Sequence, residues 1–394
     1  MKVIIDKAER LWKMPQPALG SMKFIQKRLA SRNVRIIDLE RLLPEIPRID
    51  SLSNDIQKLS PHPVNIPADP DLIAQLKNKI IERHQALKPL SIDPSRELAI
   101  IPGVRMAASF VSLALLNPGD IAAYPDPGAQ FYRCAICLAD GNPRRYALLE
   151  SNDYIMNTSG LNFPHKKTKM IFLDYPHNPT GAMVDYYFYR DLLKSVKFDN
   201  ILVVADCAHI HPGNLDAIVP LQVPNARRKV LELHSFSTTF GVAGLGFAAG
   251  HRDIITVLEN LLNAVGFVPD CNSVKWALTC LDHAEEVFSA RMETLQKRRV
   301  ILVDGLKKLG WRVRENKILP FIWVKIPIRS TSIAFARRFF AKAGVRVASG
   351  TDFGEGGEGW LRMTLCCDEQ ILTESLERLA QHSRIWQRKF RPES

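Results

Sequence analysis

The sequence has little of what marks membrane, disordered or disulfide-rich proteins. In its 394 residues the longest apolar run, Met106 to Leu116, has about half the length of a bilayer-spanning helix. A mean hydropathy of −0.08 and 46% hydrophobic residues are typical of a globular chain, which excludes disorder and collagen. The opening segment, MKVIIDKAERLWK, breaks its apolar triplet with charge, so no secretory signal is expected there.

Cysteine is also scarce, with seven residues spread along the chain. An odd, scattered set favours a reducing compartment, and we therefore expect a cytoplasmic protein. Cys134 and Cys137 form a C-x-x-C pair, but a spacing of three places both on one face of a predicted helix beside apolar neighbours. Buried small side chains are the favoured interpretation over a redox pair.

The chain is basic, with 53 Lys and Arg against 41 Asp and Glu, a net charge of +12. These residues occur in short clusters, such as the one at 297–299, and no cluster is interleaved with aromatic residues. The pattern favours solvated surface clusters that help to attract anionic metabolites, and it disfavours binding of nucleic acid. We expect neither a nucleic-acid partner nor a membrane.

Short apolar runs alternate with helix-length segments, a pattern that predicts an α/β fold with a doubly wound, mainly parallel sheet. After Asp282 the pattern changes to a long charged helix and a smaller α/β unit. We predict an N-terminal arm and part of the small domain at 1–50, a large domain at 51–282 and a small C-terminal domain at 283–394. The predicted strands are 97–101, 121–124, 145–149, 170–174, 201–205, 311–314, 321–326 and 360–365, and the predicted helices are 71–87, 103–116, 283–309, 332–343 and 368–388.

Ligands of such sheets lie at the carboxyl ends of the strands. The loops at those ends and a later segment contain IIPGVRMAAS, YPDPGAQFY, FLDYPHNPTGAMV, VVADCAHIH, HSFSTTFGVAGLGFAAG and FGEGGEGWLRMTL. In this order the segments resemble class I/II aminotransferases of the pyridoxal-phosphate (PLP) fold type I, and among them the LL-diaminopimelate aminotransferase-like group. The resemblance runs from about Leu72 to the end, and the HNPTG segment is its most specific motif. It implies a homodimer.

Several residues match positions that hold cofactor or substrate in that family. The resemblance implies that Asp206 pairs with the pyridine nitrogen, that Asn178 donates to the ring oxygen and that Arg362 holds the substrate carboxylate. The same residues have plainer interpretations as a turn cap, a turn closure and an ion pair, which the matching motifs disfavour. For Ser235 and Ser237, a role in binding the cofactor and a purely structural role are equally favoured. The phosphate is expected near Ser235, Ser237 and the helix that begins at Gly103.

Other positions depart from the family. Thr238 stands where the family has the lysine that forms a Schiff base with the cofactor and moves the α-proton, and threonine can do neither. His209 replaces a tyrosine and Ala129 replaces the aromatic residue that stacks on the ring. Gly246 is assigned the place of the phosphate-binding arginine. The segment 38–43 lacks the glycine of the family's closing loop.

Three further interpretations are weaker. The segment D-C-A-H-I-H at 206–211 offers metal-ligand side chains, but one pocket histidine and one surface histidine are favoured, so we expect no metal. The glycines at 244, 246 and 250 do not have dinucleotide-loop spacing. Arg105, just inside a helix N-terminus, is either a substitute for the missing phosphate arginine or a solvated surface residue.

The sequence therefore favours an aminotransferase-like protein that has lost standard transamination, a pseudoenzyme that binds a small carboxylate or phosphate-bearing metabolite or has a regulatory role. Whether it is an enzyme stays open. No cofactor is expected, and PLP or pyridoxamine phosphate (PMP) held without a covalent link is the alternative. The second hypothesis is an active enzyme with lysine-free or cofactor-independent chemistry, in which His209 is the base.

Overall fold

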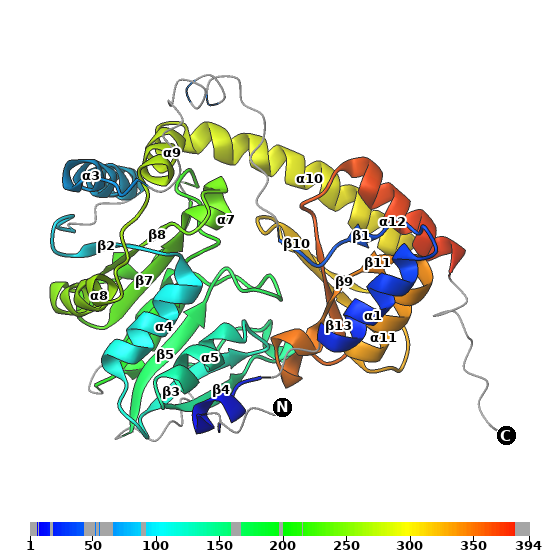
Figure 1. Cartoon of the computed structure of the whole chain (residues 1–394), viewed down its shortest axis with the longest axis horizontal. Coiled ribbons are helices and arrows are strands. Elements are labelled where there is room, and N and C mark those ends of the chain that lie inside the picture. Colours follow the sequence, from blue (N-terminus) through cyan, green and yellow to red (C-terminus); the bar gives the residue numbers. More distant parts are fainter. Residues whose placement is uncertain are drawn as a thin grey trace.

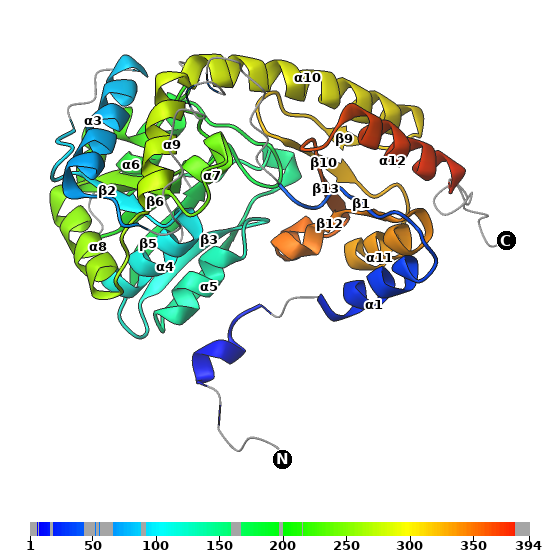
Figure 2. The same ribbon diagram turned by 45° about the horizontal axis from the view of Figure 1, so that its top comes forward.

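The computed structural model describes residues 6, 8–15, 19–42, 52, 55, 66–87, 92–158, 167–196, 200–214 and 216–382. Figure 1 shows a larger and a smaller unit, each a sheet covered by helices, with α10 (Ala284–Lys308) running along the top of both. Figure 2 shows the same helix spanning the two units from a second direction. The predicted boundaries between the domains stay predictions.

The larger unit contains a seven-stranded sheet in the order β2-β8-β7-β6-β5-β3-β4. β8 pairs antiparallel with its two neighbours, and the remaining pairs are parallel. The predicted doubly wound, mainly parallel sheet is therefore confirmed. Its strands are β2 (Leu98–Ile101), β3 (Ile121–Asp126), β4 (Asn142–Ala147), β5 (Thr168–Asp174), β6 (Leu202–Asp206), β7 (Val230–Ser235) and β8 (Gly246–Gly250).

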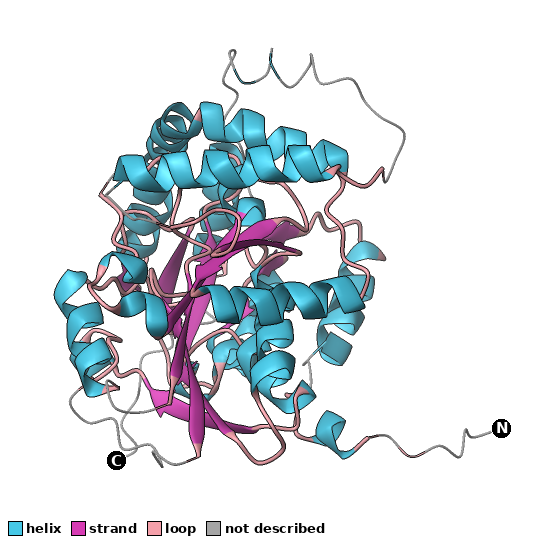
Figure 3. Cartoon of the chain, turned by 90° about the vertical axis from the view of Figure 1, so that its left-hand side faces the viewer, coloured by secondary structure: helices cyan, strands magenta, loops and turns pink. Residues whose placement is uncertain are grey.

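Helices cover both faces of this sheet, as Figure 3 shows. Alternation along a strand sends Met170 and Phe172 to one apolar cluster and Ile171 and Leu173 to the other. The central strands β5 and β6 are mostly apolar because both of their faces are covered, whereas the edge strand β4 (NPRRYA) is largely polar and has no buried residue. One face is covered by α4 (Val104–Leu115), α5 (Phe131–Leu138) and α8 (Arg252–Ala264), and the other by α3 (Pro70–Leu87), α6 (Tyr186–Ser195) and α9 (Cys271–Asp282).

The smaller unit joins the two ends of the described chain. Its antiparallel sheet has the order β12-β13-β10-β9, and a separate parallel pair links β1 to β11. Ile37 and Leu39 pack in the same apolar cluster as Trp311 and Phe335, so the N-terminal segment is part of this core. The elements of the smaller unit are α1 (Leu19–Ala30), β1 (Ile37–Asp38), β9 (Val313–Arg314), β10 (Phe321–Lys325), α11 (Ser332–Ala343), β11 (Val345–Arg346), β12 (Ala348–Ser349), β13 (Trp360–Thr364) and α12 (Glu369–Gln381). The short helix η1 (Glu9–Trp12) lies against α5 of the larger unit.

Most predicted elements match to within one to three residues, and α11 matches at both ends. The predicted strand at 145–149 begins instead at Asn142, because the pairing with β3 starts directly after the turn at Gly141. α12 ends at Gln381, and the rest of the predicted helix from 383 onward lies outside the described residues. Within the described ranges, no helix has the length and apolar character needed to cross a bilayer.

Gly246 lies in the antiparallel pair of β7 and β8, opposite Ser235. A Cβ atom at this position would lie 2.2 Å from the carbonyl oxygen of His234. That distance is too short for any contact, and the obstacle is backbone. The close approach of the two strands therefore requires glycine at 246.

We predict that Gly246→Ala lowers the free energy of unfolding by about 1 to 3 kcal/mol, because the strands must separate. Urea titration measures the change. Gly141→Ala is the control: its Cβ would first meet the Cγ2 atom of Ile136 at 3.0 Å, a side-chain atom that can shift. A loss at Gly246 no larger than the loss at Gly141 would contradict the close-approach argument.

Candidate active site

The carboxyl ends of β5, β6 and β7 and the start of α4 surround a cavity of about 380 Å³. This is the edge at which ligands of parallel sheets bind. Seven of the eight residues selected from the sequence line it, and Arg362 is the one that does not. Those seven are Gly103, Asn178, Asp206, His209, Ser235, Ser237 and Thr238.

Thr238 lies in the short helix α7 (Phe236–Phe240), which begins directly after β7. Its backbone N–H and its hydroxyl both donate to Ser235 Oγ, at 3.1 and 3.2 Å. Ser237 Oγ donates to the carbonyl of Val242 at 2.8 Å. No lysine is among the described residues that line the cavity. The described cavity wall therefore offers no side-chain amine at position 238 or elsewhere.

Two carboxyl groups lie at the ends of adjacent strands, because Asp174 of β5 is in register with Asp206 of β6. Tyr132 OH donates to Asp206 Oδ2 at 2.6 Å, and the N–H of Ala208 donates to Oδ1 at 2.9 Å. Burial raises the pKa of Asp206 to about 6. Burial and then the charge of Asp206 raise the pKa of Asp174 well above its usual value. Burial therefore disfavours the ionised form of both carboxyl groups, and the charge of Asp206 disfavours it further for Asp174.

His209 lines the cavity with its ring centre 5.6 Å from that of Phe321. Burial, with smaller effects of the Arg291 and Arg362 guanidinium groups, lowers its pKa to about 3. His209 is therefore neutral at physiological pH. A base this weak removes protons poorly, which counts against its predicted catalytic role.

Arg362 lies behind the cavity wall in β13, with 8% of its surface exposed. Its Nη1 donates to Asn178 Oδ1 at 2.9 Å and its Nη2 to the carbonyl of Glu40 at 2.9 Å. The guanidinium also stands over the Phe353 ring, 4.8 Å from its centre. Arg362 thus lies beside Asn178 and fixes that amide so that Nδ2 is the group left to donate.

The wall at the start of α4 differs from expectation in two ways. Phe131 contributes an aromatic ring although position 129 is alanine, and the guanidinium of Arg105 lies 5.5 Å from that ring's centre. Arg105 lines the cavity and is also exposed to solvent, so neither interpretation of this residue is excluded. The assignment of the lost phosphate arginine to Gly246 is wrong, because that backbone position has no room for a side chain.

The D-C-A-H-I-H segment does not converge on one point. Asp206 bonds to Tyr132, while His211 accepts from the N–H of Gly213 at 3.0 Å. Cys207 instead faces two side chains of β7.

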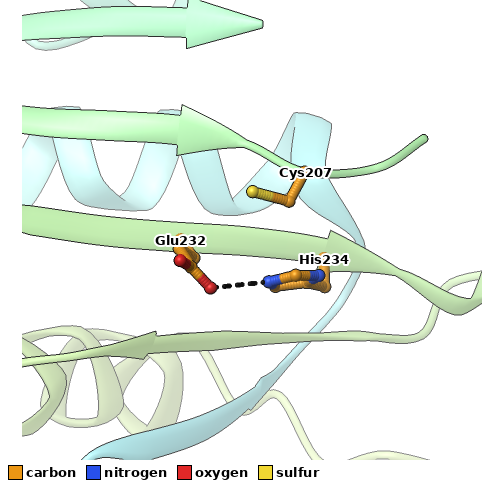
Figure 4. Close-up of side chains that lie close together, drawn as sticks. All are labelled: Cys207, Glu232 and His234. Carbon is orange, nitrogen blue, oxygen red and sulfur yellow. Dashed lines mark hydrogen bonds and ion pairs between the residues drawn. The ribbon is translucent and has the colours of Figure 1, made fainter. Parts of the chain in front are cut away.

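Those two are Glu232 and His234, and Figure 4 shows them with Cys207. The ligand atoms of the three lie within 4.8 Å of one another. However, Glu232 Oε1 accepts from the N–H of Leu221 at 2.7 Å and Oε2 bonds to His234 Nε2 at 3.0 Å. The imidazole stacks on Phe247 with ring centres 4.3 Å apart. Both carboxylate oxygens of Glu232 are therefore already used in hydrogen bonds within the fold.

Two charged residues of the cavity wall, Asp174 and Arg291, were not selected as site residues from the sequence. Asp174 had a signal, because it ends a predicted strand at the ligand-binding edge and precedes Asn178 by four residues. Arg291 had none, since it is one of many charged residues in a long helix.

This fold and this cavity define a PLP-type aminotransferase scaffold, and the chain belongs to the aminotransferase class I and II family, whose profile matches residues 39–379. An LL-diaminopimelate aminotransferase of Halothermothrix orenii is 32% identical over 297 residues, 73% of this chain and 75% of the relative. The enzyme of the same name from Moorella thermoacetica is 28% identical over 95% of this chain and 98% of its own. The solved structure of substrate-bound BacF from Bacillus subtilis is 26% identical and matches with a TM-score of 0.86 over 97% of this chain and 98% of its own.

The expectation that no cofactor binds is not supported, because the family uses PLP. In this cavity Asp206 would hold a ring nitrogen and the Nδ2 of Asn178 would donate to a ring oxygen. The cavity also offers hydroxyl and backbone donors and Arg105 for a phosphate. These residues fit the cofactor as a noncovalent ligand, and they lack the amine for a covalent one.

We predict that Asp174→Asn raises the melting temperature at pH 8 by roughly 2 to 4 °C, which corresponds to about 1 kcal/mol. A carboxyl whose pKa is raised by folding stabilises the protein at low pH, and that contribution is lost as the pH rises through the folded-state pKa. The amide removes this loss, so the variant's stability should fall less than that of the wild type between pH 4 and pH 8. Melting curves across that range measure it.

Asp126→Asn is the matched control. Asp126 is also buried, but it accepts from the N–H of Gly356 at 2.8 Å and pairs with Arg145 at 3.1 Å. Its amide variant should melt at a lower temperature at pH 8. If Asp174→Asn were equally destabilising, the carboxyl pair would be an integral part of the fold's hydrogen bonding.

Proposed function

We propose that this chain binds small anionic metabolites in the aminotransferase cavity and does not catalyse transamination by the route of its relatives. The observation that carries the proposal is Thr238 in a cavity whose described wall contains no lysine. Transamination needs a side chain that attaches the cofactor and carries the α-proton. A threonine hydroxyl that donates to Ser235 Oγ does neither.

The cavity residues suit PLP, PMP, or an amino acid or 2-oxo acid, held without a covalent bond. Asp206 accepts from a ring or amino N–H, and Asn178 donates from Nδ2. Ser235 and the free N–H groups at the start of α4 hold a phosphate, with Arg105 beside them. When bound, a pyridinium ring supplies an electron sink. A homodimer and a cytoplasmic location belong to the same proposal and rest on family membership and cysteine content.

The second hypothesis, an active lysine-free enzyme, depends on a base in the cavity. His209 was the candidate, and burial makes it a much poorer base than a free imidazole. Asp206 titrates closer to neutrality, but it is held by Tyr132 and Ala208. Ligand binding without turnover is therefore the better-supported function.

We predict that the purified protein with added PLP, an amino acid and a 2-oxo acid gives no transamination above a buffer control. Chromatography of the amino acid and 2-oxo acid products measures turnover. A rate on the order of 1 per second, ordinary for an enzyme, would contradict the proposal.

We predict that Thr238→Lys acquires a borohydride-reducible bond to PLP, seen as a mass increase by mass spectrometry, and that the wild type does not. The ring partners Asp206 and Asn178 are in place, and the nearby guanidinium of Arg291 favours the neutral, reactive amine. Thr238→Met, of similar length without an amine, is the control. Failure of the lysine variant to react would show that the cavity no longer fits the cofactor.

A further inference from the structure

Arg291 contributes a cation to the cavity wall next to the position of the missing lysine. It extends from α10, and its Nη1 donates to the carbonyls of Thr238 and Thr239 at 2.7 and 3.1 Å. Both carbonyls belong to α7. The side chain is thus held against the helix that carries position 238.

This guanidinium has no acidic partner among the described residues. Its hydrogen bonds to the two carbonyls use Nη1 alone, and its Nε and Nη2 have no partner in the described part of the chain. Neither atom is sealed from solvent, in contrast to the buried Nε of Arg362. Burial lowers the pKa of Arg291, as expected for a cation without a counter-ion. The Nε–Nη2 edge is therefore open.

Arg291 also lines a second, smaller cavity of about 20 Å³. Arg291, His209, Thr238 and Pro320 line both cavities. The carboxyl groups of Asp174 and Asp206 also line the main cavity, but no ion pair joins either of them to Arg291. The cavity therefore contains an unpaired cation in addition to the acidic pair.

We propose that Arg291 binds the carboxylate of the metabolite, through a two-donor contact from its Nε–Nη2 edge. A partly buried cation is costly without an anion, and the planar edge of a guanidinium matches a planar carboxylate. The ligand class is a small carboxylic acid held beside Thr238. The inference rests on the proposed binding function and assigns its anion to Arg291. Arg362 is a poor alternative because its Nη atoms already hold Asn178 and Glu40.

The test is calorimetric titration of the full chain with succinate. Arg291→Gln should weaken binding at least tenfold, because a charge-assisted two-donor contact is lost. Arg291→Lys keeps the charge without the planar edge, so its affinity for succinate should lie between those of the wild type and Arg291→Gln. Melting curves of the ligand-free variants establish that each is folded.

Arg299→Gln is the matched control. Arg299 is another arginine of α10, it is buried and donates to the carbonyl of Leu319 at 3.1 Å, and it does not line the cavity. Its variant should bind succinate like the wild type. Equal binding by the wild type and Arg291→Gln would overturn the assignment to Arg291 and leave the binding function standing. A wild type that binds neither succinate nor PMP would overturn both, and transamination by the wild type would overturn the proposed function alone.

Discussion

The parallel register of β5 and β6 is the constraint on which the cavity depends. It sets Asp174 opposite Asp206 at the edge where the strands end, so two buried carboxyl groups share one site. Neither can ionise fully beside the other without a cation or a donor, and Tyr132 supplies the donor for Asp206. The same cavity carries the open guanidinium edge of Arg291. A ligand with an N–H group and a carboxylate complements both charges at once.

Position 238 carries a threonine hydroxyl and no amine, and the framework around it is intact. Ser235, Asn178 and the start of α4 line the cavity because strand register and helix packing place them there. A likeness of fold therefore does not by itself establish transamination for this chain. A TM-score of 0.86 to BacF reports the framework, whereas transamination depends on a single amine.

Local sequence patterns predicted the elements and most of the cavity, since alternating apolar residues and strand ends are local features. These local patterns predicted the bounds of α11 and the cavity positions of Asn178 and His209, which follow β5 and β6. Arg291 could not be predicted, because its direction depends on where α10 crosses the sheet ends, and no local pattern encodes that crossing. Gly246 was misassigned for a similar reason: only the approach of β7 and β8 shows that its backbone leaves no room.

The two arginines have different tasks, and this bears on catalysis. Arg362 is committed to Asn178 and the backbone of Glu40, while Arg291 has an open edge. Both charges lower the pKa of His209, and a carboxylate bound at Arg291 would offset one of them. Burial, the largest cause of the lowered pKa of His209, would remain, and a bound ligand would bury the imidazole further by excluding water. We therefore expect His209 to stay a neutral hydrogen-bonding group in the liganded cavity, as the proposed binding function requires.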